Sequence, residues 1–424
     1  MGFFGAIGEC IRSLSGLEIW GGVECTLNRV GNTYFDQLHW NGHLYRFDDL
    51  ERFAQLGLRT LRFPVQWERI EAAADVFDWH WIDERMAEVR RLGIRPIVGL
   101  LHHGSGPRWT SLLDPQFPER LARFAGAFAR RFPEVDAYTP INEPLTTARF
   151  SALYGHWYPH ARDDRSFLMA LFHQYRAILL AMEAIRRVNS AALLIATEDI
   201  GKVHATPRLR YQADFENARR FMTYHWLRGT PPQAGPLAQW LGANGVDAAQ
   251  MEWFRAHGDP GTIAGVNHYI TSERYIDENV SAYAAPTHGG NGRDRYADTE
   301  AAAVGIPLCG WSGILREVHE HAPGPIAITE VHLGRASDEQ IAWLMSAYDA
   351  AEQARTLGLD IRAVTVWSLL GSYNWIHLVT RDEGAYEPGV FDVRTGERRP
   401  TPLAAALRAL VRGCYDSRQN RSPA

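Results

Sequence analysis

Lysine is almost absent from this chain. Lys202 is the only lysine among 44 basic residues, the acidic residues number 49, and the formal net charge is −5. Domains that bind nucleic acid carry a basic patch or stripe, so we expect no nucleic-acid partner. No apolar run approaches the about 20 residues of a membrane span, so we expect a soluble protein with no membrane partner.

Cysteine is scarce as well. The four cysteines, Cys10, Cys25, Cys309 and Cys414, lie far apart and form no Cys-x-x-Cys pair. This spacing argues against a zinc knuckle or a disulfide framework and favours a reducing compartment, so we predict a cytoplasmic protein. Residues 1–16 are apolar but lack a basic start and a clear small-residue cleavage site, which predicts a loose leader rather than a signal peptide.

Patterns that bind metal ions are missing, although the chain has 17 histidines. No His-x-His closes the first predicted strand, and no His-Glu-x-x-His lies on a predicted helix. The side chains of His319 and His321 point apart if this segment is helical. We therefore expect no metal site and no cofactor, and we rank a metal-dependent barrel hydrolase well below a metal-free one.

Short β-branched runs alternate with helical patterns along the chain, which is typical of a parallel sheet built from strand–helix units. The predicted strands lie at 17–22, 58–64, 95–103, 135–142, 192–199, 263–269, 325–331 and 363–370. The segments between them carry apolar residues at three- and four-residue spacing and end in glycine. Eight such units predict an α/β fold, a (β/α)8 TIM barrel in a single domain.

We place this barrel at residues 17–412, between the leader and a C-terminal tail at 413–424. Two long connections follow the fifth and sixth strands. The first contains an amphipathic helix at 215–229, and the second a glycine-rich stretch at 287–296. No strand directly precedes that stretch, which argues against a phosphate-binding loop. No linker or shift in composition indicates a second domain.

Two predicted strands end in glutamate. Glu143 closes the fourth run in TPINEPL, and Glu330 closes the seventh in IAITEVHLG. The carboxyl ends of barrel strands meet at one mouth, so these side chains are expected to face each other. Paired carboxyls cleave glycosidic bonds when one protonates the leaving oxygen and the other attacks the anomeric carbon. The alternative is that each glutamate only begins a helix, where a negative charge is favourable.

Five segments together resemble family 1 of the glycoside hydrolases, the retaining β-glycosidases, over roughly residues 17–412. TPINEP is similar to the family's Thr-x-Asn-Glu-Pro element, and AITE to its Ile-Thr-Glu-Asn-Gly element. LRFPVQWERI resembles Arg-Phe-Ser-x-x-Trp-x-Arg-Ile, GVNHYIT resembles Gly-Leu-Asn-Tyr-Tyr-Thr, and VWSLLGSYNW resembles Val-Trp-Ser-Leu-Leu-Asp-Asn-Phe-Glu-Trp. The five occur in the family's order, each at the end of a predicted strand.

The resemblance implies a catalytic role for five residues. Glu143 corresponds to the acid/base and Glu330 to the nucleophile, with Arg62 and Tyr269 as hydrogen-bond donors to Glu330. A cation and a phenol would keep that carboxylate ionised and oriented. Asn142 would bind the sugar 2-hydroxyl. The alternatives are a purely structural ion pair for Arg62 and core packing for Tyr269.

The resemblance also implies residues that bind the substrate, a carbohydrate or glycoside. Trp367 corresponds to the family's aromatic platform and His102 to a histidine that contacts sugar hydroxyls. The remaining candidates are Asn28, His103, Asn374 and Trp375. A core role remains the alternative for Trp367, since the chain has 14 tryptophans.

Several of these positions depart from the family's pattern. His103 stands where the family usually has tryptophan, and Asn374 replaces the glutamate that receives the 4- and 6-hydroxyls. Val331–His332 replaces the Asn-Gly that follows the nucleophile. An amide both donates and accepts, whereas a carboxylate only accepts, so we expect a glycon other than plain glucose, either deoxy, modified or acidic.

Glu24 has no carboxylate counterpart in the family and could face the mouth or form a structural salt bridge. Glu198 and Asp199 close the fifth run and could line the outer pocket. The sequence leaves their roles open.

The expected activity is therefore that of an O-glycosyl hydrolase that uses double displacement through a covalent glycosyl-enzyme. A carbohydrate-binding protein with little or no activity on the same scaffold is the rival. The presence of both carboxyls with Arg62 and Tyr269 argues against it. A transglycosidase shares the mechanism and is not distinguished, and the oligomeric state stays unknown.

Restoring the family's carboxylate by Asn374→Glu is expected to raise kcat/KM on ordinary aryl β-glucosides by about 10-fold, because a carboxylate accepts both hydroxyls. Steady-state kinetics on glucosides and on other glycosides would measure the change. The absence of any gain on glucosides would contradict the expectation.

Overall fold

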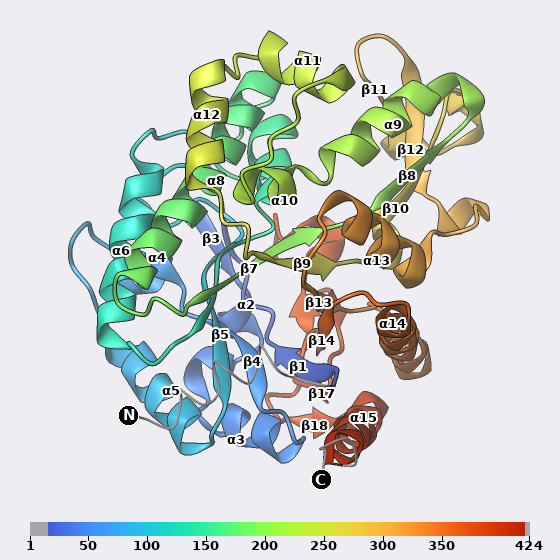
Figure 1. The fold of residues 1–424 in the computed structure, drawn as a ribbon. Helices are drawn as coiled ribbons and strands as arrows, with labels where there is room; N and C mark the ends of the chain where they lie inside the picture. Colours follow the sequence, from blue (N-terminus) through green and yellow to red (C-terminus); the bar gives the residue numbers. More distant parts are fainter. Residues whose placement is uncertain (1–15, 420–424) are drawn as a thin grey trace.

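Eight parallel strands close into a barrel in the computed structural model of this chain, which describes residues 16–419 (Figure 1). Around the barrel the order is β1, β14, β13, β9, β7, β6, β5 and β4. The bounds are β1 Glu18–Gly22, β4 Thr60–Pro64, β5 Arg95–His102, β6 Ala137–Asn142, β7 Leu193–Asp199, β9 Ile263–Asn267, β13 Ile326–Val331 and β14 Ile361–Val366. Each coincides with a predicted run to within a few residues, so the predicted TIM barrel is confirmed.

Helices surround these strands (Figure 1). The main ones are α3 Asp48–Gln55, α5 His80–Arg91, α6 Phe117–Arg131, α8 Asp164–Arg186, α13 Gly310–His321, α14 Ser337–Thr356 and α15 Pro402–Gln419. In α6 the buried residues Phe117, Leu121, Phe124 and Phe128 recur every three or four positions and form one apolar stripe. Burial of each such side chain contributes about 1.5–3 kcal/mol, which holds the helix on the barrel.

A separate apolar cluster takes one residue from each of seven barrel strands. Its members are Trp20, Ile97, Ala137, Ile195, Ile263, Ala327 and Ala363, each no more than 8% exposed. Side chains contributed in layers by several strands are what fills the interior of a TIM barrel. The barrel is therefore a packed core, and any site must lie at one of its ends.

Two insertions lie outside the barrel. A hairpin of β2 (Leu27–Val30) and β3 (Thr33–Asp36) follows β1, and β8 (Lys202–Ala205), β10 (Glu273–Asp277), β12 (Arg295–Glu300) and β11 (His288–Gly290) form a small sheet. The glycine-rich stretch is part of the β11–β12 hairpin. The amphipathic helix predicted at 215–229 was wrong in extent, since α9 (Arg210–Arg219) and α10 (Met222–Leu227) divide that segment.

The predicted boundaries of the barrel domain stay predictions. Residues 1–15 of the leader and 420–424 of the tail lie outside the described residues. The last helix, α15, continues past residue 412 to Gln419.

Within residues 16–419, α8 is the one helix long and apolar enough to cross a membrane by length and composition. In its most apolar window, 67% of the residues are buried inside the protein. The core helix of a soluble protein has the same properties, so the helix by itself does not indicate a membrane span.

A buried ion-pair cluster joins the two ends of the chain. Arg398 donates from Nε and Nη2 to the two oxygens of Asp49 at 2.6 and 2.9 Å, and His43 Nδ1 lies 2.9 Å from Asp49 Oδ2. All three side chains are at most 1% exposed. Asp49 belongs to the first turn of α3, whereas Arg398 precedes α15, so the cluster ties the first barrel helices to the last.

Asp49→Ala is expected to lower the free energy of unfolding by about 3–5 kcal/mol, because it leaves a buried arginine without its partner. Urea unfolding would measure the change. The neighbouring Asp48 also contacts arginines but is 42% exposed. Asp48→Ala is the matched control and is expected to change stability by less than about 1 kcal/mol. Equal effects of the two substitutions would contradict a stabilising role for the buried cluster of Asp49, Arg398 and His43.

Candidate active site

Glu330 lies next to the carboxyl end of β13, at an irregularity in the strand pairing. Ile328 is the register partner of Val266 on β9, whereas Glu330 is the partner of Asn267. Two steps along β13 therefore correspond to one step along β9. A bulge of this kind bends a strand and re-aims a side chain, and such bulges are frequent beside active sites. The side chain of Glu330 is buried, with 2% of the residue exposed.

Each carboxylate oxygen of Glu330 accepts a hydrogen bond from a different donor. Arg62 Nη1 donates to Oε1 at 2.6 Å, and the hydroxyl of Tyr269 donates to Oε2. The same Arg62 nitrogen donates to the carbonyl of Thr329 at 2.8 Å. Burial and then the charge of Glu330 raise the pKa of Tyr269, so the phenol keeps its proton. The cation and the phenol together fix the plane of the carboxylate.

Glu143 stands at the turn between β6 and α7 (Pro144–Ala148), with φ 45° and ψ 62°. A residue other than glycine rarely adopts this left-handed conformation, which costs about 1–3 kcal/mol. Pro144 takes the first helical position, where its missing N–H is not needed. The backbone N–H of Glu143 donates to the carbonyl of Thr197 on β7 at 3.2 Å. The turn is thus anchored to the neighbouring strand.

The carboxyl group of Glu143 is buried, and no arginine or lysine in the described range pairs with it. Asn267 Nδ2 donates to its Oε1 at 2.6 Å. Burial raises the pKa of Glu143 well above its ordinary value, and the negative charges of Glu330, Asp199 and Glu198 raise it further. Glu143 therefore holds a proton more readily than an exposed glutamate does.

Asn267 links the two carboxyl groups. It is the register partner of Glu330 and donates to Glu143, while its Oδ1 accepts from the hydroxyl of Thr329 at 2.6 Å. The two predicted carboxyls thus share one site. Sequence analysis did not assign a role to Asn267, although its place at the end of a predicted strand was the available signal.

Glu198, at the end of β7, supports the turn that carries Glu143. Its carboxylate accepts from the backbone N–H groups of Leu145 and Thr146 at 2.9 and 3.1 Å. It also accepts from the hydroxyls of Thr146 and Thr223 at 3.0 and 2.7 Å. The side chain is fully buried, and burial raises its pKa to about 7. Glu198 therefore lies beneath the site and does not line an outer pocket.

Asp199 is half-buried at the rim of the site. Its Oδ1 accepts from the hydroxyl of Ser272 at 2.6 Å, and burial raises its pKa. Its charge contributes to the raised pKa of Glu143, so it belongs to the electrostatic surroundings of the site.

Asn142 lies between Arg62 and two histidines. Its Oδ1 accepts from Arg62 Nη2 at 2.7 Å and from the hydroxyl of Thr197 at 2.8 Å. Its Nδ2 lies 3.3 Å from His102 Nε2 and 3.5 Å from His103 Nε2. An amide nitrogen is a donor, so both Nε2 atoms are acceptors and the ring protons are on Nδ1.

Both imidazoles are neutral. Burial, then His103 and Arg62, lower the pKa of His102 well below its ordinary value, and burial and Arg62 lower that of His103 to about 3. His103 Nδ1 lies 2.9 Å from the hydroxyl of Thr147. Its ring contacts Trp375, with centroids 5.6 Å apart, and its Nε2 lies 3.8 Å from Glu143 Oε2. His103 therefore borders the acid/base candidate.

Trp367 follows β14 and is buried, with 4% of the residue exposed. His102 lies parallel to its ring with centroids 5.4 Å apart, and the guanidinium carbon of Arg62 lies 4.7 Å from the ring centroid. A Cβ atom on Gly22 would come within 2.5 Å of the indole, so only glycine allows this approach to β1. The indole Nε1 donates to Glu24 Oε2 at 3.3 Å. Stacking of a sugar on this ring stays a prediction.

The amide of Asn374 organises the loop 374–385. Its Oδ1 accepts from the backbone N–H groups of Glu383 and Ala385, each at 3.1 Å, and its Nδ2 donates to Asp382 Oδ1 at 3.0 Å. Contact with a sugar stays a prediction, and at most one N–H of this amide is left for it. Asn374→Glu would place two carboxylates side by side, so a gain on glucosides requires that the loop rearrange.

Two side chains from other segments of the chain hold the same loop. Asn28 Nδ2 donates to the carbonyl of Val379 at 3.0 Å, and Trp157 Nε1 donates to the carbonyl of Leu378 at 2.7 Å. The Oδ1 atom of Asn28 is buried and has no partner in the described part of the chain. Contact of Asn28 with a sugar stays a prediction, for which this Oδ1 atom is the available acceptor.

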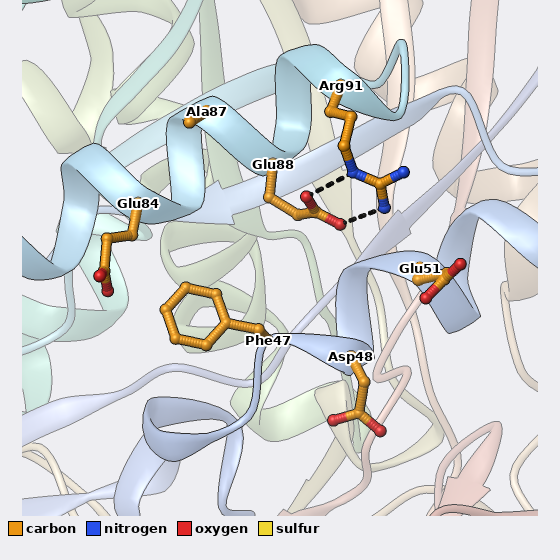
Figure 2. Close-up of a pocket in the computed structure, with 7 residues that line it drawn as sticks. All are labelled: Phe47, Asp48, Glu51, Glu84, Ala87, Glu88 and Arg91. Carbon is orange, nitrogen blue, oxygen red and sulfur yellow. Dashed lines mark hydrogen bonds and ion pairs between the residues drawn. The ribbon is translucent and has the colours of Figure 1, made fainter.

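Two open grooves lie elsewhere on the molecule, and neither includes a predicted site residue. The groove in Figure 2 lies between α3 and α5 and has a volume of about 420 Å³. Glu88 and Arg91 pair across one turn of α5, and three further acidic side chains surround them. Among the residues that the structure describes, no three histidine, cysteine or carboxylate side chains gather as they would around a metal ion.

Comparison with known proteins gives a family match and a shared fold. The model of the family described as glycosyl hydrolase family 1 matches residues 40–384. The solved structure of a family 1 β-glucosidase from Thermotoga maritima superposes with a TM-score of 0.73 at 18% identity, covering 94% of this chain and 98% of that one. The same enzyme in complex with castanospermine gives a TM-score of 0.75.

Curated relatives include beta-glucosidase 47 of Arabidopsis thaliana, 23% identical over 84% of this chain and 73% of the relative. Aryl-phospho-beta-D-glucosidase BglC of Bacillus subtilis is 24% identical over 79% of both chains. Thermostable beta-glucosidase B of Thermobispora bispora is 25% identical over 94% of this chain and 86% of the relative.

Glu143→Gln is expected to make the protein more stable at alkaline pH. A raised pKa means that the folded state binds the proton more tightly than the unfolded state. The stability from this group is therefore present below the unfolded pKa and is lost as pH rises through the folded one. The free energy of unfolding of the variant should match that of the parent at about pH 5 and exceed it by ~1–3 kcal/mol at about pH 9.

Urea unfolding at the two pH values would measure this difference. Glu183→Gln is a suitable control, because Glu183 lies on α8 with 51% of its side chain exposed. A Glu143→Gln protein that is less stable than the parent at alkaline pH would show that the carboxylate is well solvated or paired.

Proposed function

We propose that this chain, which belongs to glycosyl hydrolase family 1 and is an O-glycosyl hydrolase, cleaves a β-glycosidic bond by a retaining double displacement. The observation that supports the mechanism is the unequal surroundings of its two carboxyl groups. Glu330 accepts from a cation and a phenol, whereas Glu143 is buried among negative charges with one amide donor. One is arranged as a carboxylate and the other as an acid.

In the first step, an oxygen of Glu330 attacks the anomeric carbon and forms a glycosyl ester. The bond from that carbon to the leaving oxygen breaks, and Glu143 gives its proton to the leaving oxygen. Asn267 holds Oε1 of Glu143 as an acceptor, so Oε2 is the oxygen that bears the proton. As negative charge leaves Glu330, the hydrogen bonds from Arg62 and Tyr269 keep the ester correctly placed.

In the second step, Glu143 is a carboxylate and accepts a proton from water. The water oxygen attacks the anomeric carbon, the ester bond breaks, and Glu330 returns to its ionised form. The negative charge of Glu330 is a main cause of the raised pKa of Glu143. Glu330 loses that charge when it forms the ester, and the pKa of Glu143 then falls. The same residue can thus act first as an acid and then as a base.

The glycon is proposed to differ from plain glucose. Asn374 stands where the family has a carboxylate, and most of its hydrogen-bonding capacity holds the loop 374–385. Relatives with β-glucosidase, aryl-phospho-β-glucosidase and 6-phospho-β-galactosidase names match at similar identity, so identity alone favours none of these glycons.

Two substitutions test the roles of the carboxyl groups. Glu330→Ala is expected to lower kcat/KM by ~10^4-fold or more, because no covalent intermediate can form. Glu143→Ala should lower kcat/KM by ~10²–10⁴-fold for alkyl leaving groups, but much less for 2,4-dinitrophenyl glycosides, which need no proton. The parent should lose kcat/KM at alkaline pH as Glu143 loses its proton, and Glu143→Gln should lack that loss.

A 2-deoxy-2-fluoro glycosyl fluoride should trap the intermediate, and mass spectrometry should find the adduct on Glu330. NMR of the first-formed sugar should show the β anomer. Glu88→Gln, in the groove of Figure 2, is the control that keeps full activity. An α product, or an adduct on another residue, would overturn the proposal.

A further inference from the structure

Glu24 is a further buried carboxyl group at this end of the barrel, besides Glu143, Glu330 and Glu198. It follows β1 by two residues, and 3% of the residue is exposed. In the described part of the chain no cationic side chain pairs with it. Burial, and to a smaller extent the charge of Glu330, raise its pKa. A buried carboxyl without a cation is costly to keep, and this one is not explained by a structural salt bridge.

The position of Glu24 is set by its neighbours. The backbone N–H of Thr26 donates to Oε1 at 2.9 Å, and the backbone N–H of Glu24 donates to the hydroxyl of Ser368 at 3.3 Å. The indole Nε1 of Trp367 donates to Oε2 at 3.3 Å, which is a long bond. The carboxyl therefore lies at the edge of the proposed sugar platform, on the side of β1.

This carboxyl has free capacity to accept hydrogen bonds. A carboxyl oxygen can accept more than one hydrogen bond, and each oxygen of Glu24 accepts one here, from Thr26 and from Trp367. Four residues further along, the buried Oδ1 of Asn28 also lacks a partner in the described residues. The segment 24–28 thus holds unused acceptors, whereas Asn374, in the loop after the neighbouring strand β14, has its acceptor occupied.

We propose that Glu24 determines the specificity for the glycon, by accepting a hydrogen bond from a sugar hydroxyl at the edge of Trp367. The proposal rests on the proposed function, since it concerns the glycon subsite of the same site. In the family that the chain resembles, the carboxylate that receives sugar hydroxyls stands at position 374, in the loop after β14. In this protein Glu24, in the segment after β1, would take that role.

The same arrangement indicates a neutral glycon. Glu24, Glu143 and Glu330 are three carboxyl groups at the proposed subsite. Arg62, which pairs with Glu330, also donates to Asn142. A uronic acid or a phosphorylated sugar would bring a further negative charge without a free partner among the described residues of the site. The sequence leaves a deoxy, a modified or an acidic glycon open, and this arrangement disfavours the acidic one.

The test uses 2,4-dinitrophenyl β-D-glucoside and β-D-galactoside, their 3-, 4- and 6-deoxy derivatives, and the glucuronide. Glu24→Gln should lower kcat/KM by about 10- to 100-fold on the preferred parent glycoside, because an amide nitrogen, which cannot accept, replaces one of the carboxyl oxygens. On the one deoxy derivative that lacks the contacted hydroxyl, the parent protein and Glu24→Gln should agree within about twofold. The glucuronide should be the poorest substrate of the parent protein.

An equal loss on every glycoside would show that Glu24 only supports Trp367, and would overturn the proposal. No loss on any glycoside, or preference for the glucuronide, would overturn it as well. Glu24→Asp replaces Glu24→Gln if that variant does not fold. It keeps the carboxyl group but withdraws it by one methylene, so the same glycosides should show the loss. Glu51→Gln, in the groove of Figure 2, is the control and should behave as the parent on all substrates.

Binding separates this proposal from the proposed function. Calorimetry needs no turnover. The probe is whichever of phenyl 1-thio-β-D-glucoside and phenyl 1-thio-β-D-galactoside the parent protein binds more tightly, since both are neutral sugars that resist cleavage. At least tenfold weaker binding by Glu24→Gln would support the proposal even if the parent protein forms no covalent adduct. Unchanged binding, or no binding by the parent protein, would overturn it, whereas the adduct on Glu330 tests the mechanism alone.

Discussion

The guanidinium of Arg62 is the contact on which the rest of the site depends. From β4 it reaches Glu330 and the carbonyl of Thr329 on β13, and it reaches Asn142 on β6. One rigid, planar cation thus sets the relative positions of three strand ends. Because Arg62 is paired with Glu330, its charge is largely neutralised there, and Glu143 has no arginine or lysine partner within the described residues. In the part of the chain that the structure describes, Glu330 has a cationic partner and Glu143 has none, because Arg62 pairs with Glu330.

Burial strengthens that difference. In a medium of low dielectric constant, like charges raise each other's pKa more than they do in water, and Glu143 feels Glu330, Asp199 and Glu198 together. Glu198 has a second effect, because it accepts from the first backbone N–H groups of α7 and so holds the turn in which Glu143 stands. The buried acid beneath the site therefore contributes both geometry and electrostatics to the acid above it.

Two predicted sugar-binding residues also hold a loop at the mouth of the barrel. Asn28 and Asn374 were expected to contact the sugar, and both donate to or accept from the loop 374–385. Of the two amide oxygens, that of Asn28 is left without a partner among the described residues, whereas that of Asn374 accepts from two backbone N–H groups. Contact of either side chain with a sugar stays a prediction.

The amino-acid sequence by itself determined the barrel, because strand and helix periods repeat locally eight times and each run is read from its own residues. It also indicated Glu143, Glu330, Arg62 and Tyr269, since each stands at the end of a predicted strand and such ends converge. Only the tertiary structure decided the roles of Glu198 and Asn374. Their hydrogen-bond partners come from other segments, and no local pattern reports whether a polar side chain meets a backbone amide or an open cavity. For the same reason the extent of the helices near residue 220 and the insertion sheet beside them could not be read from periodicity.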